Sequence, residues 1–274
     1  MSPGSSWMVL LIAKVVVSAG FVLGVTAAVE RLGPRLGALI AASPQLSVVT
    51  LSFFTLEQGP AFAAESAFWT IPGMCATIAL FLGYLAATRV VPGPRIRSVT
   101  SGVTLGSLGF ILTSSLLGAL PLTRGTIFPL AAAVCAGTAW MVRRLPDTAT
   151  LRRAPASPLI LATRAGASVF TVVTVTSLAH LLGPKWSGLV AGFPVNGLPV
   201  MAILHYQYGA EVIKPFIRIF PAGAFGLCLF NLVASVGLVP LGLVATLALA
   251  YGLDIAYLIA VSRLGRPSPP GRSS

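Results

Sequence analysis

The sequence contains LGPRLGALIAASP at residues 32–44 and LGPKWSGLVAGFP at residues 182–194, 150 positions further on. Both copies carry a Gly-Pro pair near their start and a proline at their end. The same offset relates Lys14 to Arg164, Glu57 to Gln207 and Gly59 to Gly209. A spacing that holds over so many positions indicates an internal duplication, and the rest of the two halves matches in hydropathy alone.

The composition around these copies is that of a membrane protein. Of the 274 residues, 56% are hydrophobic and 9% are charged, and the mean hydropathy is +0.92, whereas a soluble domain has about 25% charged residues. The chain therefore has too few polar side chains to cover a soluble surface. Because lipid offers no partner to free backbone groups, and because no run alternates as in a membrane barrel, we expect an all-α polytopic protein.

Nine segments are apolar over about the 20 residues that a spanning helix needs. They run over residues 8–29, 36–56, 66–88, 98–119, 125–142, 159–181, 187–204, 213–236 and 240–261. Residues 145–158 form a linker of proline, small polar residues and charges. We therefore expect an N-terminal repeat over 1–144 with about five spans, and a C-terminal repeat over 159–274 with about four spans and a short basic tail.

The positive charges fall mainly on one side of this arrangement. Loops that follow odd-numbered spans, together with the C-terminus, hold 15 of the 18 Lys and Arg residues. By the positive-inside rule, that face and the 145–158 linker are cytoplasmic and the N-terminus is outside. The net charge of +12 is explained by these loops, so no nucleic-acid partner is expected.

The number of spans also predicts how the halves are related. Five spans precede the second copy, so span six runs opposite to span one. The halves would then be inverted-topology repeats, related by a pseudo-twofold axis in the membrane plane, as in many secondary transporters.

Residues 187–211, SGLVAGFPVNGLPVMAILHYQYGAE, resemble GlpM-like bacterial inner-membrane proteins. The residues that carry the resemblance are Gly188, Leu189, Pro194, His205, Tyr206, Gly209 and Glu211. The first half, with LEQGPAFAAE at 56–65, is similar to a group of duplicated bacterial membrane proteins, but has Thr55 where the second half has His205. The resemblance implies an inner-membrane location and a link to envelope polysaccharide production, and it gives no substrate.

Proline predicts a site in spans two and seven. Pro44 is expected inside span two, whereas Pro194 and Pro199, with Asn196 and Gly197 between them, should break span seven outright. Broken spans at equivalent positions indicate a solute site near the bilayer midplane; the alternative is a packing kink. The full set of expected binding residues is Ser43, Pro44, Gln45, Pro194, Asn196, Gly197, Lys14 and Arg164.

The charged and titratable residues have more than one interpretation. Asp254, in the middle of span nine, should face the bundle interior and either carry a proton for coupled transport or serve as a neutral structural acid. Lys14 and Arg164 either contact an anionic solute or extend to the membrane interface. The two histidines, His180 and His205, are expected at the interface, with a proton relay as the alternative. Glu57 and Glu211 are expected to be solvated, with gating of access to the broken helices as the alternative.

Several functions are excluded by missing motifs. The sequence has no GxxxxGK[ST] loop, no HExxH and no GxSxG, and Cys75, Cys135 and Cys228 have no metal-ligand spacing. We therefore expect no enzyme activity, no cofactor and no metal. The sequence favours an inner-membrane secondary transporter for a small polar or anionic solute, as a monomer or a homo-oligomer. The alternative is a non-transporting accessory subunit of an envelope polysaccharide or lipid biosynthesis system.

Overall fold

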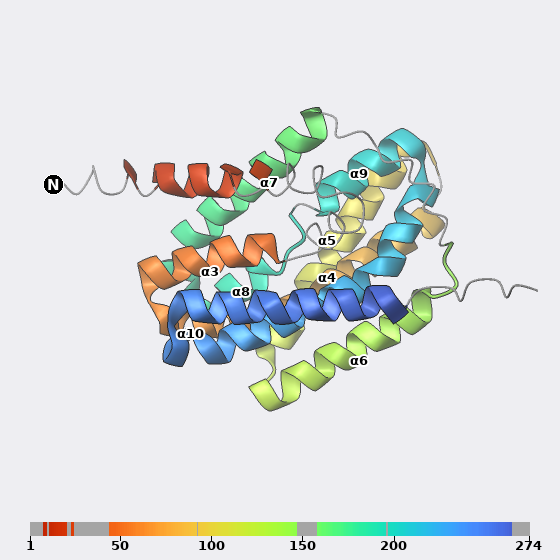
Figure 1. Ribbon diagram of the computed structural model, residues 1–274. Helices are drawn as coiled ribbons and strands as arrows, with labels where there is room; N and C mark the ends of the chain where they lie inside the picture. The colour runs from red at the N-terminus through yellow and green to blue at the C-terminus, as the bar shows by residue number, and fades with distance from the viewer. Residues whose placement is uncertain are drawn as a thin grey trace, which may run out of the picture.

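The computed structural model describes residues 8–9, 11–20, 23–24, 44–91, 93–146, 158–195 and 197–264. Within these residues all regular secondary structure is helical (Figure 1), which confirms the predicted all-α class for this part of the chain. After the helical segment Leu11–Gly20, the helices are α3 (Gln45–Gln58), α4 (Pro60–Val90), α5 (Arg95–Ala119), α6 (Arg124–Val142), α7 (Pro158–Ser177), α8 (Ala179–Ala191), α9 (Gly197–Tyr208), η1 (Ala210–Val212) and α10 (Ile213–Leu264).

Four helices of the described chain are long and apolar enough to cross a membrane, namely α4, α5, α6 and the stretch Ala210–Arg263. The central one is α4, because 78% of its most apolar stretch is buried, against 28% for each of the others. The membrane class is thus supported, whereas the count of nine spans stays a prediction, since much of residues 8–43 lies outside the described ranges.

Helix α10 is a hairpin. Its path turns at Gly242, which has φ 76° and ψ 174°, a conformation open almost only to glycine. The two arms, 213–241 and 243–264, lie side by side (Figure 1), and we call them the first and second arms. They correspond to the predicted spans 213–236 and 240–261.

The order of the elements repeats with the offset of 150. Helix α3 corresponds to α9, α4 corresponds to η1 with the first arm, and α5 corresponds to the second arm. The segment Leu11–Gly20 corresponds to part of α7. Helix α6 has no counterpart among the described residues, and it lies between α5 and α7 in the chain.

Two buried apolar clusters each combine residues of both halves, and positions in one cluster are related to positions in the other by the offset of 150. The first cluster includes Leu51, Ala63 and Ala67 of the first half with Phe230 and Ala234 of the second. The second cluster includes Met201, Ile213 and Ile217 of the second half with Leu80 and Tyr84 of the first. Each of these residues has its equivalent, 150 positions away, in the other cluster. Such reciprocal packing is the signature of a twofold relationship.

Helix α4 and the first arm, which are equivalent elements, run antiparallel. The later part of α4 meets the start of the arm, where the Phe81 ring lies 5.3 Å from that of Phe216 and 4.4 Å from that of Phe220. The start of α4 meets the end of the arm, since Ala67 shares the first cluster with Ala234. A twofold axis that related these two elements would therefore be perpendicular to α4, and the inverted repeats themselves stay a prediction.

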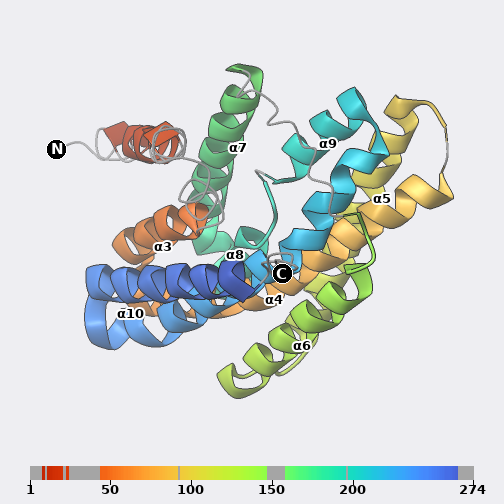
Figure 2. The same cartoon turned by 45° about the vertical axis from the view of Figure 1, so that its right-hand side comes forward.

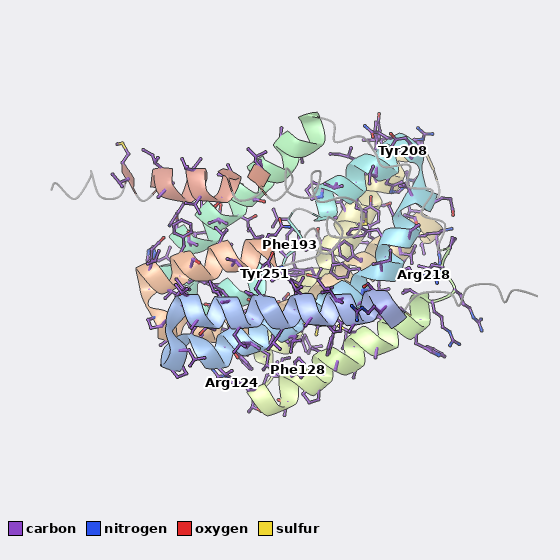
Figure 3. All side chains as sticks on the ribbon, viewed as in Figure 1. Arg124, Phe128, Phe193, Tyr208, Arg218 and Tyr251 are labelled. Carbon is purple, nitrogen blue, oxygen red and sulfur yellow. The ribbon has the colours of Figure 1, made fainter. Side chains whose placement is uncertain are left out.

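Residues that the charge rule assigns to one face do gather at one end of the molecule. Arg95 donates to the carbonyl of Gln207 at 3.1 Å, and Arg218 donates to that of Leu145 at 2.7 Å. Arg124, assigned to the other face, lies 3.7 Å from Glu65. Figure 3 shows Arg124 and Arg218 at opposite ends. We call these the Arg124 end and the Arg218 end.

Candidate functional site at a broken helix

The predicted break of span seven is present. Helix α8 ends at Ala191 and α9 begins at Gly197, and Pro194 lies between them. Pro199 falls in the first turn of α9, where its missing N–H leaves no helical hydrogen bond unmade. Asn196 lies outside the described residues, so its part in the break stays a prediction.

The break lies against the middle of α4. A Cβ added at Gly73 would sit 2.7 Å from the carbonyl oxygen of Leu189, and one added at Gly192 would sit 2.6 Å from the backbone of Gly73. Only glycine on both helices permits this approach. The two glycines therefore fix where α8 stops against α4.

The backbone freed by the break is satisfied within the protein. The Thr77 hydroxyl on α4 donates to the carbonyl oxygen of Gly192 at 2.5 Å. The N–H of Leu198 donates to the carbonyl of Pro194 at 2.8 Å, which starts α9. At membrane depth a non-helical backbone is tolerated only where protein or water provides such partners.

The side chains around the break are largely aromatic. The Phe193 ring packs edge-on against Phe110 at 5.0 Å, and a Cβ at Gly197 would meet Phe81 and Phe216. Figure 3 shows Phe193 near the centre of the molecule. The polar cavity expected between Pro44 and Pro194 stays a prediction, because Ser43 also lies outside the described residues.

Helix α3 begins at Gln45, directly after Pro44. Residues 36–43 of the expected span 36–56 lie outside the described residues, so the place of Pro44 inside a span stays a prediction. Helix α9 likewise begins soon after Pro194, the equivalent proline. Both short helices thus start beside the matched prolines, and the half-buried Gln45 occupies the first turn of α3.

Lys14 forms a buried ion pair with Glu57. Its Nζ lies 2.9 Å from each carboxylate oxygen, and the two side chains are 5% and 14% exposed. Glu57, expected to be solvated, is therefore buried, and the charge on Lys14 is balanced by protein. The equivalent residues are Arg164 and Gln207; Arg164 lies in α7, and its side chain lies outside the described part of the chain.

His205 was expected at the membrane interface and is instead buried, at 2% exposure. Its Nδ1 lies 3.0 Å from the Tyr84 hydroxyl, and its Nε2 lies 3.4 Å from that of Ser98. A signal was present in the sequence. At the positions related by the offset, the other half has Thr55 in place of His205 and Ala234 in place of Tyr84. The two residues that form this hydrogen bond are therefore the two that differ from their equivalents together.

Asp254 faces the interior, as predicted. It is 1% exposed, and neither carboxylate oxygen has a hydrogen-bond partner among the described residues. It packs across the α10 hairpin onto Gly226 and near Tyr257, whose hydroxyl donates to the carbonyl of Ala222 at 2.9 Å. A buried carboxyl without a partner is stable only when it holds a proton or meets a cation.

The three cysteines lie close to one another, which their sequence spacing gave no reason to expect. Cys75, Cys135 and Cys228 come from α4, α6 and the first arm, and all three are free and buried. The thiols of Cys135 and Cys228 lie within hydrogen-bonding reach of each other. In the part of the chain that the structure describes, no group of acidic, histidine or cysteine residues is arranged to hold a metal.

A cavity of about 230 Å³ lies between α4, α5 and α6, away from the break. Its lining is almost entirely apolar and includes Ala79, Leu117 and Val134, with Thr113 and Thr138 as the hydroxyl residues. It lacks the charges and hydrogen-bonding groups that a polar solute requires. The broken helix is therefore the better candidate site.

The chain matches no protein-family model, and comparisons with curated proteins and with solved structures find no similar protein.

Proposed function

We propose that this chain is a secondary transporter or permease for a small polar or anionic solute, working by alternating access. The observation that carries the proposal is the composition of the two clusters: residues of one half in the first cluster have their equivalents, from the other half, in the second cluster. A pseudo-twofold core gives the protein two similar ends, each of which can open while the other stays closed.

The antiparallel course of α4 and the first arm supports inverted repeats. If both cross the bilayer, an axis perpendicular to them lies in the membrane plane. Figure 2 shows α4 running beside α10. Rocking one repeat against the other would then exchange the environments of the two clusters. The first cluster would close one side of the site and the second cluster the other.

The proposed setting is a bacterial inner membrane, with the N-terminus outside and the C-terminus in the cytoplasm. The charge asymmetry supports this orientation, and the resemblance to GlpM-like proteins supports the location. In this orientation the Arg218 end is cytoplasmic and the Arg124 end is outside.

The solute would bind where α3 and α9 begin. The N-terminal end of each helix carries partial positive charge and favours an anionic group. Ser43, Gln45, Asn196 and the backbone beside Pro44 and Pro194 would supply hydrogen bonds. Lys14 is paired with Glu57 in the last turn of α3, at the end of that helix opposite this site, whereas Arg164 has no carboxylate at the position equivalent to Glu57. Asp254 would carry the coupled proton.

Counter-flow in proteoliposomes tests the proposal. Vesicles loaded with an unlabelled panel of small organic anions, amino acids and neutral metabolites are challenged with each radiolabelled member. We expect saturable exchange of one class, lost in Gly192→Leu, which would separate α8 from α4, and retained in Gly137→Leu on α6, where added atoms meet open space. A folded protein that exchanges no member would favour the accessory-subunit alternative.

A further inference from the structure

A titratable side chain, His205, is hydrogen-bonded to Tyr84 of the second cluster, whereas the equivalent position in the first half is Thr55. We propose that His205 is a proton-binding site, and that its protonation releases α9 from α4 and opens the Arg218 end. This inference rests on the proposed function for its role in transport, although the opening itself needs no solute.

Both nitrogens of the His205 ring are used by hydroxyl groups. A neutral imidazole has one N–H donor and one acceptor nitrogen. The ring can therefore accept from the Tyr84 hydroxyl and donate to that of Ser98, so that the hydrogen of the buried Tyr84 hydroxyl has a partner. In this form the ring joins α9 to α4 and α5.

Protonation upsets this arrangement. An imidazolium has two N–H donors and no acceptor, so both hydroxyls must accept and their hydrogens need new partners. Ser98 lies at the edge of the core, at 9% exposure, but Tyr84 is fully buried. Among the described residues Tyr84 has no hydrogen-bond partner other than His205. The protonated ring therefore leaves a buried hydroxyl unsatisfied.

Among the described residues, no carboxylate pairs with His205. From α5, Arg95 binds the carbonyls of Tyr206 and Gln207. Helices η1 and α10 contribute the apolar Ile213 and Ile217. Their charged residues are already bound, since Lys214 pairs with Glu211 and Arg218 donates to a carbonyl. From α7 the one charged residue is Arg164, whose side chain lies outside the described residues. The carboxylate of Glu211 is thus already paired with Lys214, and a new positive charge favours moving α9 toward water.

The first cluster cannot respond in this way. Thr55 stands where the second half has His205, and its hydroxyl donates to the carbonyl of Leu51 in its own helix at 2.8 Å. Ala234 stands where the first half has Tyr84. A proton at His205 would therefore open one end and leave the other closed, which is what coupling to protons requires.

Cysteine accessibility tests the proposal. With the three native cysteines replaced, Met201→Cys places a thiol in the second cluster, one turn before His205, where the native side chain is 2% exposed. Inside-out vesicles are treated with a membrane-impermeant maleimide at about pH 8 and about pH 5.5, on either side of the range in which an imidazole titrates. Rates are divided by those of Tyr208→Cys, an exposed position on the same helix, which removes the pH dependence of thiol chemistry.

We expect the normalised Met201→Cys rate to rise by about tenfold at the lower pH, as for the titration of one group. His205→Gln keeps a donor and an acceptor without titrating and should give a low rate at both pH values. Tyr84→Phe should remove the pH dependence as well, because phenylalanine has no hydroxyl that protonation could leave without a partner. Leu51→Cys, the equivalent position in the first cluster, should be insensitive to pH when labelled from the other side.

A normalised rate that is the same at both pH values would overturn the proposal, as would a pH response that survives in His205→Gln. If His205→Gln does not fold, as judged by gel filtration, a pH response that persists in Tyr84→Phe overturns it instead. Failure of every solute to exchange would count against the transport function alone, because the labelling needs no solute.

Discussion

Gly59 and Gly209, 150 positions apart, adopt almost the same backbone conformation. Their φ and ψ angles are 91° and 164° for Gly59, and 90° and 174° for Gly209. Each residue ends a short helix, α3 or α9, and starts the path into the following long helix. The duplication has thus preserved a turn as well as the order of the helices.

This turn predicts the effect of adding a side chain. Residues other than glycine are strained in this region by about 1–3 kcal/mol, so Gly59→Ala and Gly209→Ala should each lower the free energy of unfolding by that amount. Thermal unfolding in detergent micelles measures the change. Gly137→Ala is the control, because Gly137 lies in α6 with open space around it, and alanine favours a helix. Equal melting temperatures for all three variants would contradict the assignment.

The Lys14–Glu57 pair predicts a strong dependence on either partner. Glu57→Gln would leave the Lys14 ammonium buried without a counter-charge, which costs about 3–5 kcal/mol for a buried pair. Replacing both, as Lys14→Met with Glu57→Gln, should restore much of the lost stability. The measurement is again thermal unfolding in detergent.

The exposed pair at the other end is the matched control. The Glu211 side chain is 76% exposed where it meets Lys214, and such pairs contribute at most about 1 kcal/mol. Glu211→Gln should therefore unfold within a few degrees of the unmodified protein. A loss as large as that of Glu57→Gln would show that burial does not explain the difference.

The proposed orientation predicts which loops are reached from outside. Leu120, between α5 and α6, and Val90, at the end of α4, are 42% and 74% exposed. In a background without the native cysteines, Leu120→Cys should react with an impermeant maleimide in intact cells. Val90→Cys should react only after permeabilisation. The opposite pattern would reverse the orientation.

Local chemistry made the break and the buried acid predictable. Pro194 removes a backbone donor and Gly197 weakens the helix, so span seven had to be interrupted wherever it packed. Asp254 is costly in lipid, so it had to face protein. Both inferences need only the residue and its apolar neighbours in the sequence.

Partners across helices were not predictable in the same way. Lys14 finds Glu57 and His205 finds Tyr84 because particular faces of separate helices meet. In a membrane helix both buried and lipid-facing positions are apolar, so hydropathy locates a span without showing which side packs inward. The central α4 illustrates this, since its sequence is no more apolar than that of the lipid-exposed α6.

The hydrogen bond from Thr77 to Gly192 predicts how the break is held. Thr77→Val removes the hydroxyl and keeps the shape, leaving a buried carbonyl unsatisfied at a cost of about 1–3 kcal/mol. Thr77→Ser keeps the hydroxyl and should lose less. If the break forms the site, Thr77→Val should also slow counter-flow of whichever solute the protein exchanges. Equal stability of the two variants would show that another group satisfies this carbonyl.

Asp254 provides the sharpest test of coupling. Asn has nearly the same shape as Asp but cannot take up or release a proton, so Asp254→Asn should remain folded and should still exchange solute in counter-flow, which needs no net proton movement. Uptake driven by an imposed pH gradient should fall by at least about tenfold, as expected when a group that transfers protons is removed. Both assays are run on the same proteoliposomes, with Glu211→Gln as a control carboxylate at the surface. If Asp254→Asn loses exchange and gradient-driven uptake equally, the carboxyl supports the α10 hairpin rather than coupling. If it loses neither, the coupled proton binds elsewhere, and His205, whose ring is also buried, is then the first residue to test.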